Sequence, residues 1–333
     1  MCSKSSAWTV RLLCLTTALV LAAPATTQAN DKLLPDNTEM VFGFNIKTMT
    51  QSPLFTKHFQ PKIKEQMEAN QQFMAIMSAM NFDPMRDLTS ITVAVSNFKL
   101  DVAGGPPQPD ADPIIVLRGN FDVAKIEAGL GSLIGAANNE RVTTSKLGAR
   151  TLYEIKEGNR PMFACFVDNT TMIGTSSKED LQKALDRHEG KSKSKQSDAF
   201  SKLLAKADTK QAMWAVIALP DSIRTMAQGM PQGEVIEKIQ GMTMFVSAKE
   251  GMVMELNTFS TDAAGVGQIK QMFEQIKQLA GVFSLQAQDP DISKAVSDIV
   301  SNITISEGDN MVSLRIEVKS DVVEMLMKKA GGN

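Results

Sequence analysis

The fold is constrained most by a unit that repeats along the chain. Two short apolar segments flank a turn, a Ser, Thr or Asp follows, and an amphipathic helical pattern comes next. Three such units span Phe163–Arg187, Met242–Leu279 and Ile303–Lys329. A fourth, Ile91–Ile134, differs by a long Gly- and Pro-rich loop between its strands. Short turns join antiparallel strands, and Ser, Thr or Asp begins a helix, so the pattern predicts an α+β fold.

The same order of elements is predicted twice. Each half of the chain has the pattern strand, helix, hairpin, helix, hairpin, helix, beginning at Met40–Ile46 in one half and Ala212–Leu219 in the other. Without its last helix, this order approaches the ferredoxin-like or split βαβ arrangement. We therefore expect an internal duplication that gives two related lobes. Each lobe is predicted to be an antiparallel sheet with helices on one face.

One polar segment separates the two patterns. Gly190–Ser197 contains three lysines and no apolar period, which is typical of a solvated linker. The predicted division is therefore a leader at 1–29, an N-terminal lobe at 30–190 and a C-terminal lobe at 191–333, with the linker at about 190–197.

The first 29 residues have the pattern of a signal peptide. Lys4 and Arg11 precede an uncharged apolar run, Leu12–Ala23, and Thr27-Gln-Ala29 is a small-x-small cleavage site. The run is too short to span a bilayer, which takes about 20 apolar residues. We expect an exported protein, periplasmic or extracellular, with no transmembrane segment after cleavage.

The predicted mature chain excludes several classes of protein. It keeps one cysteine, Cys165, which lies in an apolar strand and is expected to be buried and without an internal disulfide. Removing Lys4 and Arg11 changes the balance from 35 basic and 37 acidic residues to 33 and 37, a net charge of −4. An acidic chain with a single remaining Trp and a single Tyr is not a candidate for binding nucleic acid.

No catalytic constellation is visible in the sequence. The two histidines, His58 and His188, have no second ligand at zinc spacing. The glycines around Gly129–Gly135 have the wrong spacing for a dinucleotide loop, and no serine lies in a nucleophile-elbow sequence. We predict a protein without a cofactor and without enzymatic activity. A hydrolase whose site is assembled from distant loops is the third alternative.

Methionine is unusually frequent, with 21 residues in the full sequence. Met242, Met244, Met252 and Met254 alternate along the two strands of one predicted hairpin. Three interpretations stay open. These side chains fill a core, they line an adaptable groove for a lipid, a peptide or another hydrophobic ligand, or their thioethers bind a soft metal such as Cu(I).

Three short motifs resemble a loose group of exported bacterial proteins of unknown function. They are Leu34-Pro-Asp-Asn-Thr-Glu-Met40, Asn81-Phe-Asp-Pro-Met-Arg-Asp-Leu88, and Val116-Leu-Arg-Gly119 followed by Phe121-Asp122. The likeness covers about half of the chain. It implies two related α+β lobes and no assigned activity, so no site residue is transferred from it.

These observations lead to two main hypotheses of function. The first is a non-enzymatic envelope protein that acts as an interaction or scaffold module for another envelope protein. The alternative is a binding protein for a small hydrophobic ligand, lipid or peptide, held in a methionine-rich cleft. A cleft lined by Met and Phe would favour ligand binding, and a filled interface between the lobes would favour scaffolding.

Overall fold

The computed structural model describes residues 31–101, 108–136, 142–157, 160–230, 233–286 and 289–330. The predicted signal peptide, 1–29, lies outside the described residues. Within the described ranges, no helix combines the length and apolar character that crossing a bilayer requires.

The strands form a single antiparallel sheet in the order β11-β12-β10-β9-β8-β1-β2-β3-β7-β6-β5-β4. They are β1 (Thr38–Phe44), β2 (Leu88–Asp101), β3 (Gln108–Gly119), β4 (Val142–Leu147), β5 (Arg150–Glu157), β6 (Arg160–Asp168), β7 (Thr171–Thr175), β8 (Met213–Ala218), β9 (Ile239–Ala248), β10 (Gly251–Ser260), β11 (Ile303–Gly308) and β12 (Met311–Lys319). The sheet together with its helices makes this an α+β protein, which confirms the predicted class.

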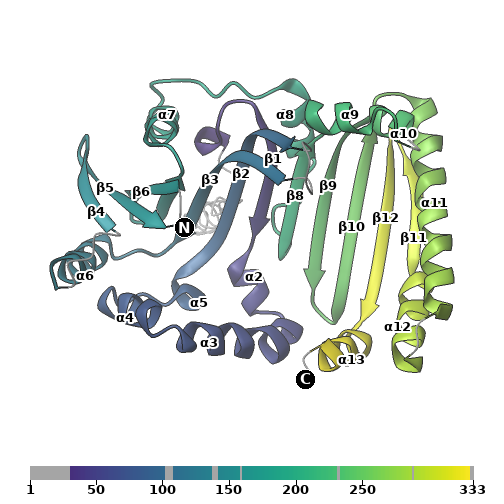
Figure 1. The fold of residues 1–333 in the computed structure, drawn as a ribbon, viewed down its shortest axis with the longest axis horizontal. Coiled ribbons are helices and arrows are strands. Elements are labelled where there is room, and N and C mark those ends of the chain that lie inside the picture. The colour runs from purple at the N-terminus through teal and green to yellow at the C-terminus, as the bar shows by residue number, and fades with distance from the viewer. Residues whose placement is uncertain are drawn as a thin grey trace, which may run out of the picture.

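Helices surround the sheet (Figure 1). They are η1 (Asp31–Leu33), α2 (Ile46–Thr50), η2 (Phe55–Phe59), α3 (Gln60–Ala69), α4 (Gln71–Ala79), α5 (Pro84–Asp87), α6 (Val123–Ala136), α7 (Lys178–His188), α8 (Asp198–Ala205), α9 (Asp221–Ala227), α10 (Gly233–Glu237), α11 (Ala263–Gln286), α12 (Pro290–Ser301) and α13 (Ser320–Ala330). In Figure 1, α7 to α10 lie along one end of the strands, and α3, α4, α5 and α13 lie along the other.

The two halves of the sheet repeat one topology. Counting outward from the centre, the first half has the order β1-β2-β3-β7-β6 and the second half has β8-β9-β10-β12-β11. β4 and β5 extend only the first half. The halves join through antiparallel pairing of β1 with β8, from Met40 opposite Ile217 to Phe44 opposite Met213. This repeated order is what a duplication would produce.

The predicted linker is held in place by the start of the first half. The Asn37 amide donates to the Lys195 carbonyl at 3.1 Å, and the Lys195 amide donates to Asp36 Oδ1 at 3.0 Å. The Gln196 side chain accepts from the Thr38 amide at 3.0 Å. The segment therefore has backbone partners although its composition is polar and basic.

The two faces of the sheet can be followed through the strand register, because paired residues point to the same side. Face A carries Val41, Ala94, Ile114 and Val216. Face B carries the residues that alternate with these along each strand. One row on face B is apolar across ten strands, in the order Ala164, Gly174, Ile115, Val93, Phe42, Ala215, Met244, Leu256, Leu314 and Ile305.

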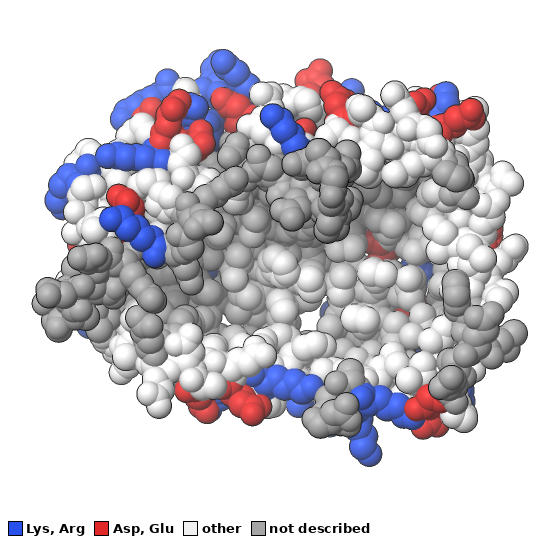
Figure 2. Space-filling view, in the orientation of Figure 1, with Lys and Arg blue, Asp and Glu red and all other residues white. Residues whose placement is uncertain are grey.

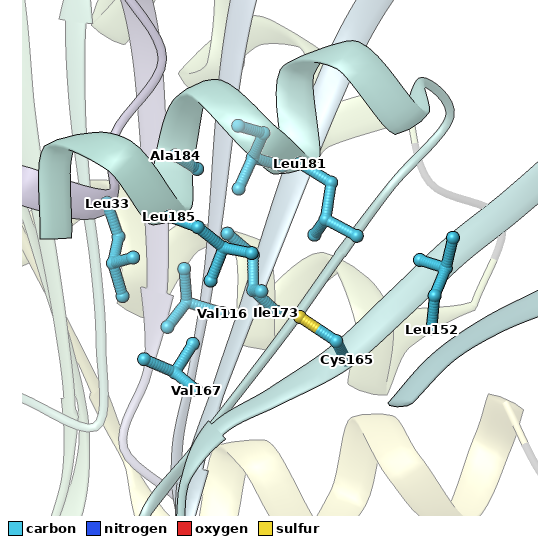
Figure 3. Close-up of a cluster of buried hydrophobic side chains, with 10 residues drawn as sticks. Leu33, Val116, Leu152, Cys165, Val167, Ile173, Leu181, Ala184 and Leu185 are labelled. Atoms are coloured by element: carbon cyan, nitrogen blue, oxygen red, sulfur yellow. The ribbon is translucent and has the colours of Figure 1, made fainter. Parts of the chain in front are cut away.

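On face A, α7 packs over the first half. Leu181 and Leu185 from this helix contact Val116, Ile173 and Cys165 from the sheet, as Figure 3 shows. Ser177 begins α7, because its hydroxyl accepts the Asp180 amide at 3.3 Å. α8 packs beside it, and its Phe200 and Leu203 join Val41 and Trp214 in a cluster shared by both halves.

On face B, helices cover the two ends of the sheet. α4 and α6 lie over the first half, where Met80 and Ile126 pack on Phe166 and Tyr153. α11 lies over the second half through Ile269.

The expectation that helices would lie on one face of each sheet is therefore wrong. The second half has α8 on face A and α11 on face B, and the first half has α7 on face A and α4 and α6 on face B. The reason lies in its inner strands. Val116 and Ile173 are apolar on face A, and their neighbours Leu117 and Met172 are apolar on face B, so both faces need cover.

A second correction concerns the first long helix. The spacing of Ile63, Met67, Met74 and Met77 predicts one helix from Pro61 to about Met80. The structure has two helices, α3 and α4, because Asn70 leaves the helical region at φ −91° and ψ 85°.

Candidate functional site

An apolar pocket of about 310 Å³ lies on face B of the first half. Its floor is formed by Leu117, Phe166 and Met172 of the sheet, and its roof by Met77 of α4 and Leu130 of α6. Among the described residues, none that lines it is charged. Ligand pockets in proteins range from about 300 to 1,000 Å³, so the size suits a slender ligand.

Phe82 is placed in the wall of this pocket by the way α4 ends. The Phe82 amide donates to the Met77 carbonyl at 2.9 Å, and the Asn81 amide donates to the Ser78 carbonyl at 3.0 Å. Asn81 has φ +50°. This pair of bonds around a left-handed residue is the Schellman motif, which brings the residue after the left-handed one back onto the helix.

An aromatic series then runs along the wall. The ring centroids of Phe82 and Phe121 are 5.8 Å apart, those of Phe121 and Phe166 are 5.5 Å apart, and those of Phe166 and Tyr153 are 6.3 Å apart. Offset and edge-on aromatic contacts of this kind add to the stability gained from burial. The series fixes one wall while the aliphatic and Met side chains opposite it are free to adapt.

Tyr153 supplies a hydroxyl to an otherwise apolar lining. It is buried, and its hydroxyl donates to Glu127 Oε1 of α6 at 3.3 Å. Burial raises the pKa of Tyr153 well above its usual range, and the nearby Glu127 carboxylate raises it further. The hydroxyl is therefore neutral and already has a partner, so the pocket offers little to an ionic ligand.

A polar pocket of about 600 Å³ adjoins the apolar one. The two share four wall residues, Met80, Phe82, Phe121 and Ile126. Its polar lining includes Asn120, Asn169 and Arg86. The guanidinium of Arg86 is held by two hydrogen bonds of 2.7 Å to the Asp87 carboxylate, which also keeps the pKa of that carboxyl below its usual range.

The four methionines singled out by the sequence share face B. Met244 is opposite Leu256, and Met254 is opposite Val246. Met242 packs into the cluster beneath α11, whereas Met252 packs into the cluster beneath α13. Six residues along the strands separate these two, about 20 Å, so the four sulfurs form a band and not one cluster.

Met244 and Met254 belong to a central strip of face B. The strip also includes Phe42, Val93 and Ile115. These side chains are half-buried and belong to none of the five buried clusters in the described part of the chain. The methionine-groove hypothesis stays a prediction, and this strip is where such a groove would lie.

Charged residues are few at the centre of the molecular face seen in Figure 2. Figure 2 shows the molecule hollowed between two rims, with Lys, Arg, Asp and Glu gathered along the rims. The described residues visible between the rims are mostly uncharged.

The titratable residues considered for catalysis lie apart from one another. His58 is 3.3 Å from Glu324 of α13, and His188 ends α7. Neither lines the two pockets described above. Among the described residues, no group of three or more His, Cys, Asp or Glu is placed to hold a metal ion.

Cys165 is fully buried beneath α7, as the sequence predicted. Burial raises the pKa of its thiol to about 11. Thiolate is therefore scarce at neutral pH, and the residue is a packing element.

The apolar pocket was not predicted from the sequence. Its residues come from two helices and five strands, and nothing in their sequence spacing connects Met77 with Leu130 or Met172. One local signal was available. Asn81-Phe82 after a helical run is the sequence of a left-handed helix end followed by an apolar residue.

Comparisons with known proteins give a likeness to solved structures alone. No model of a known protein family matches the chain, and no curated protein matches it. Among solved structures, crystal form I of TP0453 is similar with a TM-score of 0.44 and 10% sequence identity, over 90% of this chain and 96% of that chain.

Proposed function

We propose that this protein binds a lipid through a single hydrocarbon chain, which enters the apolar pocket between α4, α6 and face B. The observation that carries the proposal is the pocket itself, which has about 310 Å³ of space and a described lining without charged residues. Protein interiors are otherwise close-packed, and an unfilled apolar cavity costs stability. A hydrocarbon chain is the ligand that such a lining stabilises best.

The adjoining polar pocket supports a lipid over a purely apolar ligand. It begins at Phe82, on the boundary between the two pockets, and presents the amide side chains of Asn120 and Asn169. A chain seated in the apolar pocket would place its polar head there. The adaptable Met77 and Met172 in the wall suit chains of different shape.

Chain length tests the proposal directly. Straight-chain alcohols from 8 to 16 carbons are titrated against the purified chain by displacement of the uncharged fluorophore N-phenyl-1-naphthylamine. Each added methylene should strengthen binding about fourfold, from about 0.8 kcal/mol per buried CH₂, until the pocket is full and the affinity levels off. Affinity that does not depend on chain length would contradict a chain-binding pocket.

A pocket-filling variant identifies the site. Leu130→Trp puts a large ring into the space beneath α6 and should weaken alcohol binding at least tenfold. Leu279→Trp makes the same exchange at an exposed position on α11 and should leave affinity unchanged. Circular dichroism checks that both variants fold. If the two variants bind alcohols alike, the ligand lies elsewhere.

The interaction-module hypothesis stays a prediction. Ile276, Leu279 and Val282 of α11 are each more than half exposed and recur at helical spacing. An exposed apolar stripe is a feature of surfaces that meet another protein or a membrane.

A further inference from the structure

A third, smaller pocket lies on the other side of the sheet. It occupies about 190 Å³ at the end of the first half, where the residues before β1 approach the end of β7 and the last turns of α7. Asp36, Thr175, Asp180, Lys183 and Arg187 line it. Thr175 belongs to face A, since it pairs with Ile114 in the register. The pocket is therefore separate from the proposed lipid site on face B.

Arg187 is buried in this pocket, where it forms an ion pair with Asp36 and its Nε has no hydrogen-bond partner among the described residues. Its side chain is 4% exposed, and its Nε has no acceptor within reach. The nearest carboxylate oxygen, Asp36 Oδ1, is 3.7 Å from Nη1, which is too long for a hydrogen bond. Burying a guanidinium N–H without an acceptor is costly, and proteins almost always give such a group a partner.

Thr175 also lines the pocket and has an unpartnered polar atom. The residue is fully buried, and its Oγ1 has no hydrogen-bond partner. A buried hydroxyl without a partner forfeits the hydrogen bonds that it made to water in the unfolded chain. Two unpartnered polar groups in one pocket indicate a polar occupant that both of them contact.

The acidic residues of the pocket are already engaged by others. Asp36 Oδ1 accepts the Lys195 amide at 3.0 Å. Asp180 Oδ1 lies 3.3 Å from Lys183 Nζ, which also pairs with Glu179 at 2.8 Å. Burial lowers the pKa of Arg187, the largest influence on it, and the surrounding carboxylates only partly reverse this change. None of these carboxylates accepts a hydrogen bond from Arg187 Nε, which leaves that donor for a ligand.

We propose that this pocket binds the carboxylate group of a small organic acid. The Arg187 guanidinium donates two parallel N–H bonds to the carboxylate oxygens, and the Thr175 hydroxyl donates a third bond. Planar two-point recognition of this kind is the usual role of a buried arginine. A carboxylate fits better than a phosphate dianion, because Asp36 and Asp180 already place negative charge on the wall.

The proposal is tested with acetate as the probe. Thermal unfolding of the purified chain is followed in increasing sodium acetate, with sodium chloride at equal ionic strength as the reference and inorganic phosphate as the competing anion. Acetate should raise the Tm saturably, as expected for a ligand that binds only the folded state, while chloride should not. An equal response to acetate and chloride, or a stronger response to phosphate, would overturn the proposal.

Three variants assign the effect to the pocket. Arg187→Met should abolish the acetate-dependent rise in Tm, and the isosteric Thr175→Val should weaken acetate binding several-fold. Arg315→Met, at a side chain that is 44% exposed on β12 and lines none of the pockets described here, is the matched control and should respond like the wild type. If Arg187→Met does not fold, the acetate-dependent rise in Tm of Thr175→Val tests whether acetate binds in this pocket. An unchanged acetate response in Thr175→Val would mean that a buried water satisfies these groups.

Discussion

At the scale of single residues, the centre of the sheet depends on one glycine. Gly43 of β1 is paired with Trp214 of β8 on face A, and the indole occupies the space above the glycine. A Cβ added at Gly43 would lie 2.0 Å from Trp214 Cε2. Such an overlap cannot be relieved by a small adjustment, because Trp214 is itself packed in the cluster that both halves share.

We therefore expect Gly43→Ala to destabilise the protein by about 1–3 kcal/mol, the usual cost of overpacking a core. Gly267→Ala is the matched control, because a Cβ at this helical position of α11 meets nothing within 4 Å. It should be neutral or stabilise by up to about 1 kcal/mol. Urea unfolding followed by fluorescence gives both values, since Trp214 is the single Trp of residues 30–333. Equal stability of the two variants would show that the indole can move aside.

At the scale of elements, the sequence predicts what local chemistry determines. Ser177 begins α7 and Asp83 caps α5, and such caps can be predicted because a side-chain oxygen next to a free backbone amide is a local arrangement. What it does not predict depends on partners distant in the chain. The pairing of β1 with β8 joins residues 169 to 177 positions apart, and the pocket joins α4, α6 and five strands. Neither arrangement leaves a period or a motif in the sequence.

Asp289 shows how a residue can link two elements. It begins α12 by accepting the Asp291 amide at 2.9 Å, and its Oδ1 also accepts from Lys329 Nζ of α13 at 2.7 Å. Lys329 holds the pKa of the Asp289 carboxyl below its usual value, with help from the backbone amides. A carboxyl whose pKa is lower in the folded state stabilises that state above its unfolded pKa, about 3.9, and loses this contribution as the pH falls through the folded pKa.

Asp289→Asn separates the charge from the cap, because asparagine is also a good N-cap. The variant should have a lower Tm than the wild type at pH 7, and the difference should shrink below about pH 4 and vanish once the folded carboxyl is protonated. Thermal unfolding by circular dichroism between pH 7 and pH 2 measures it. A difference in Tm that is the same at every pH would assign the effect to the cap and not to Lys329.

At the scale of the whole molecule, the repeated topology suggests two folding units, whereas the continuous sheet suggests one. Two halves with the same strand order favour two independent folding units, and the sequence predicts lobes at 30–190 and 191–333. The structure gives the halves a common core. Leu34 and Val41 of the first half pack with Leu203 and Trp214 of the second half, so neither half can unfold without exposing apolar surface of the other.

Because the core is shared, we expect the protein to unfold in one cooperative transition, although the chain is long enough for two domains. Urea unfolding measured by Trp214 fluorescence and by far-UV circular dichroism should give coincident curves. Leu34→Ala and Leu203→Ala remove fully buried side chains from opposite halves, and each should destabilise the whole molecule by about 2–5 kcal/mol. Both substitutions should move the single transition without splitting it, because the β1–β8 pair and the shared cluster unfold together. A variant whose two probes separate would show that one half remains folded alone, and the two-lobe division of the sequence would then describe the folding units.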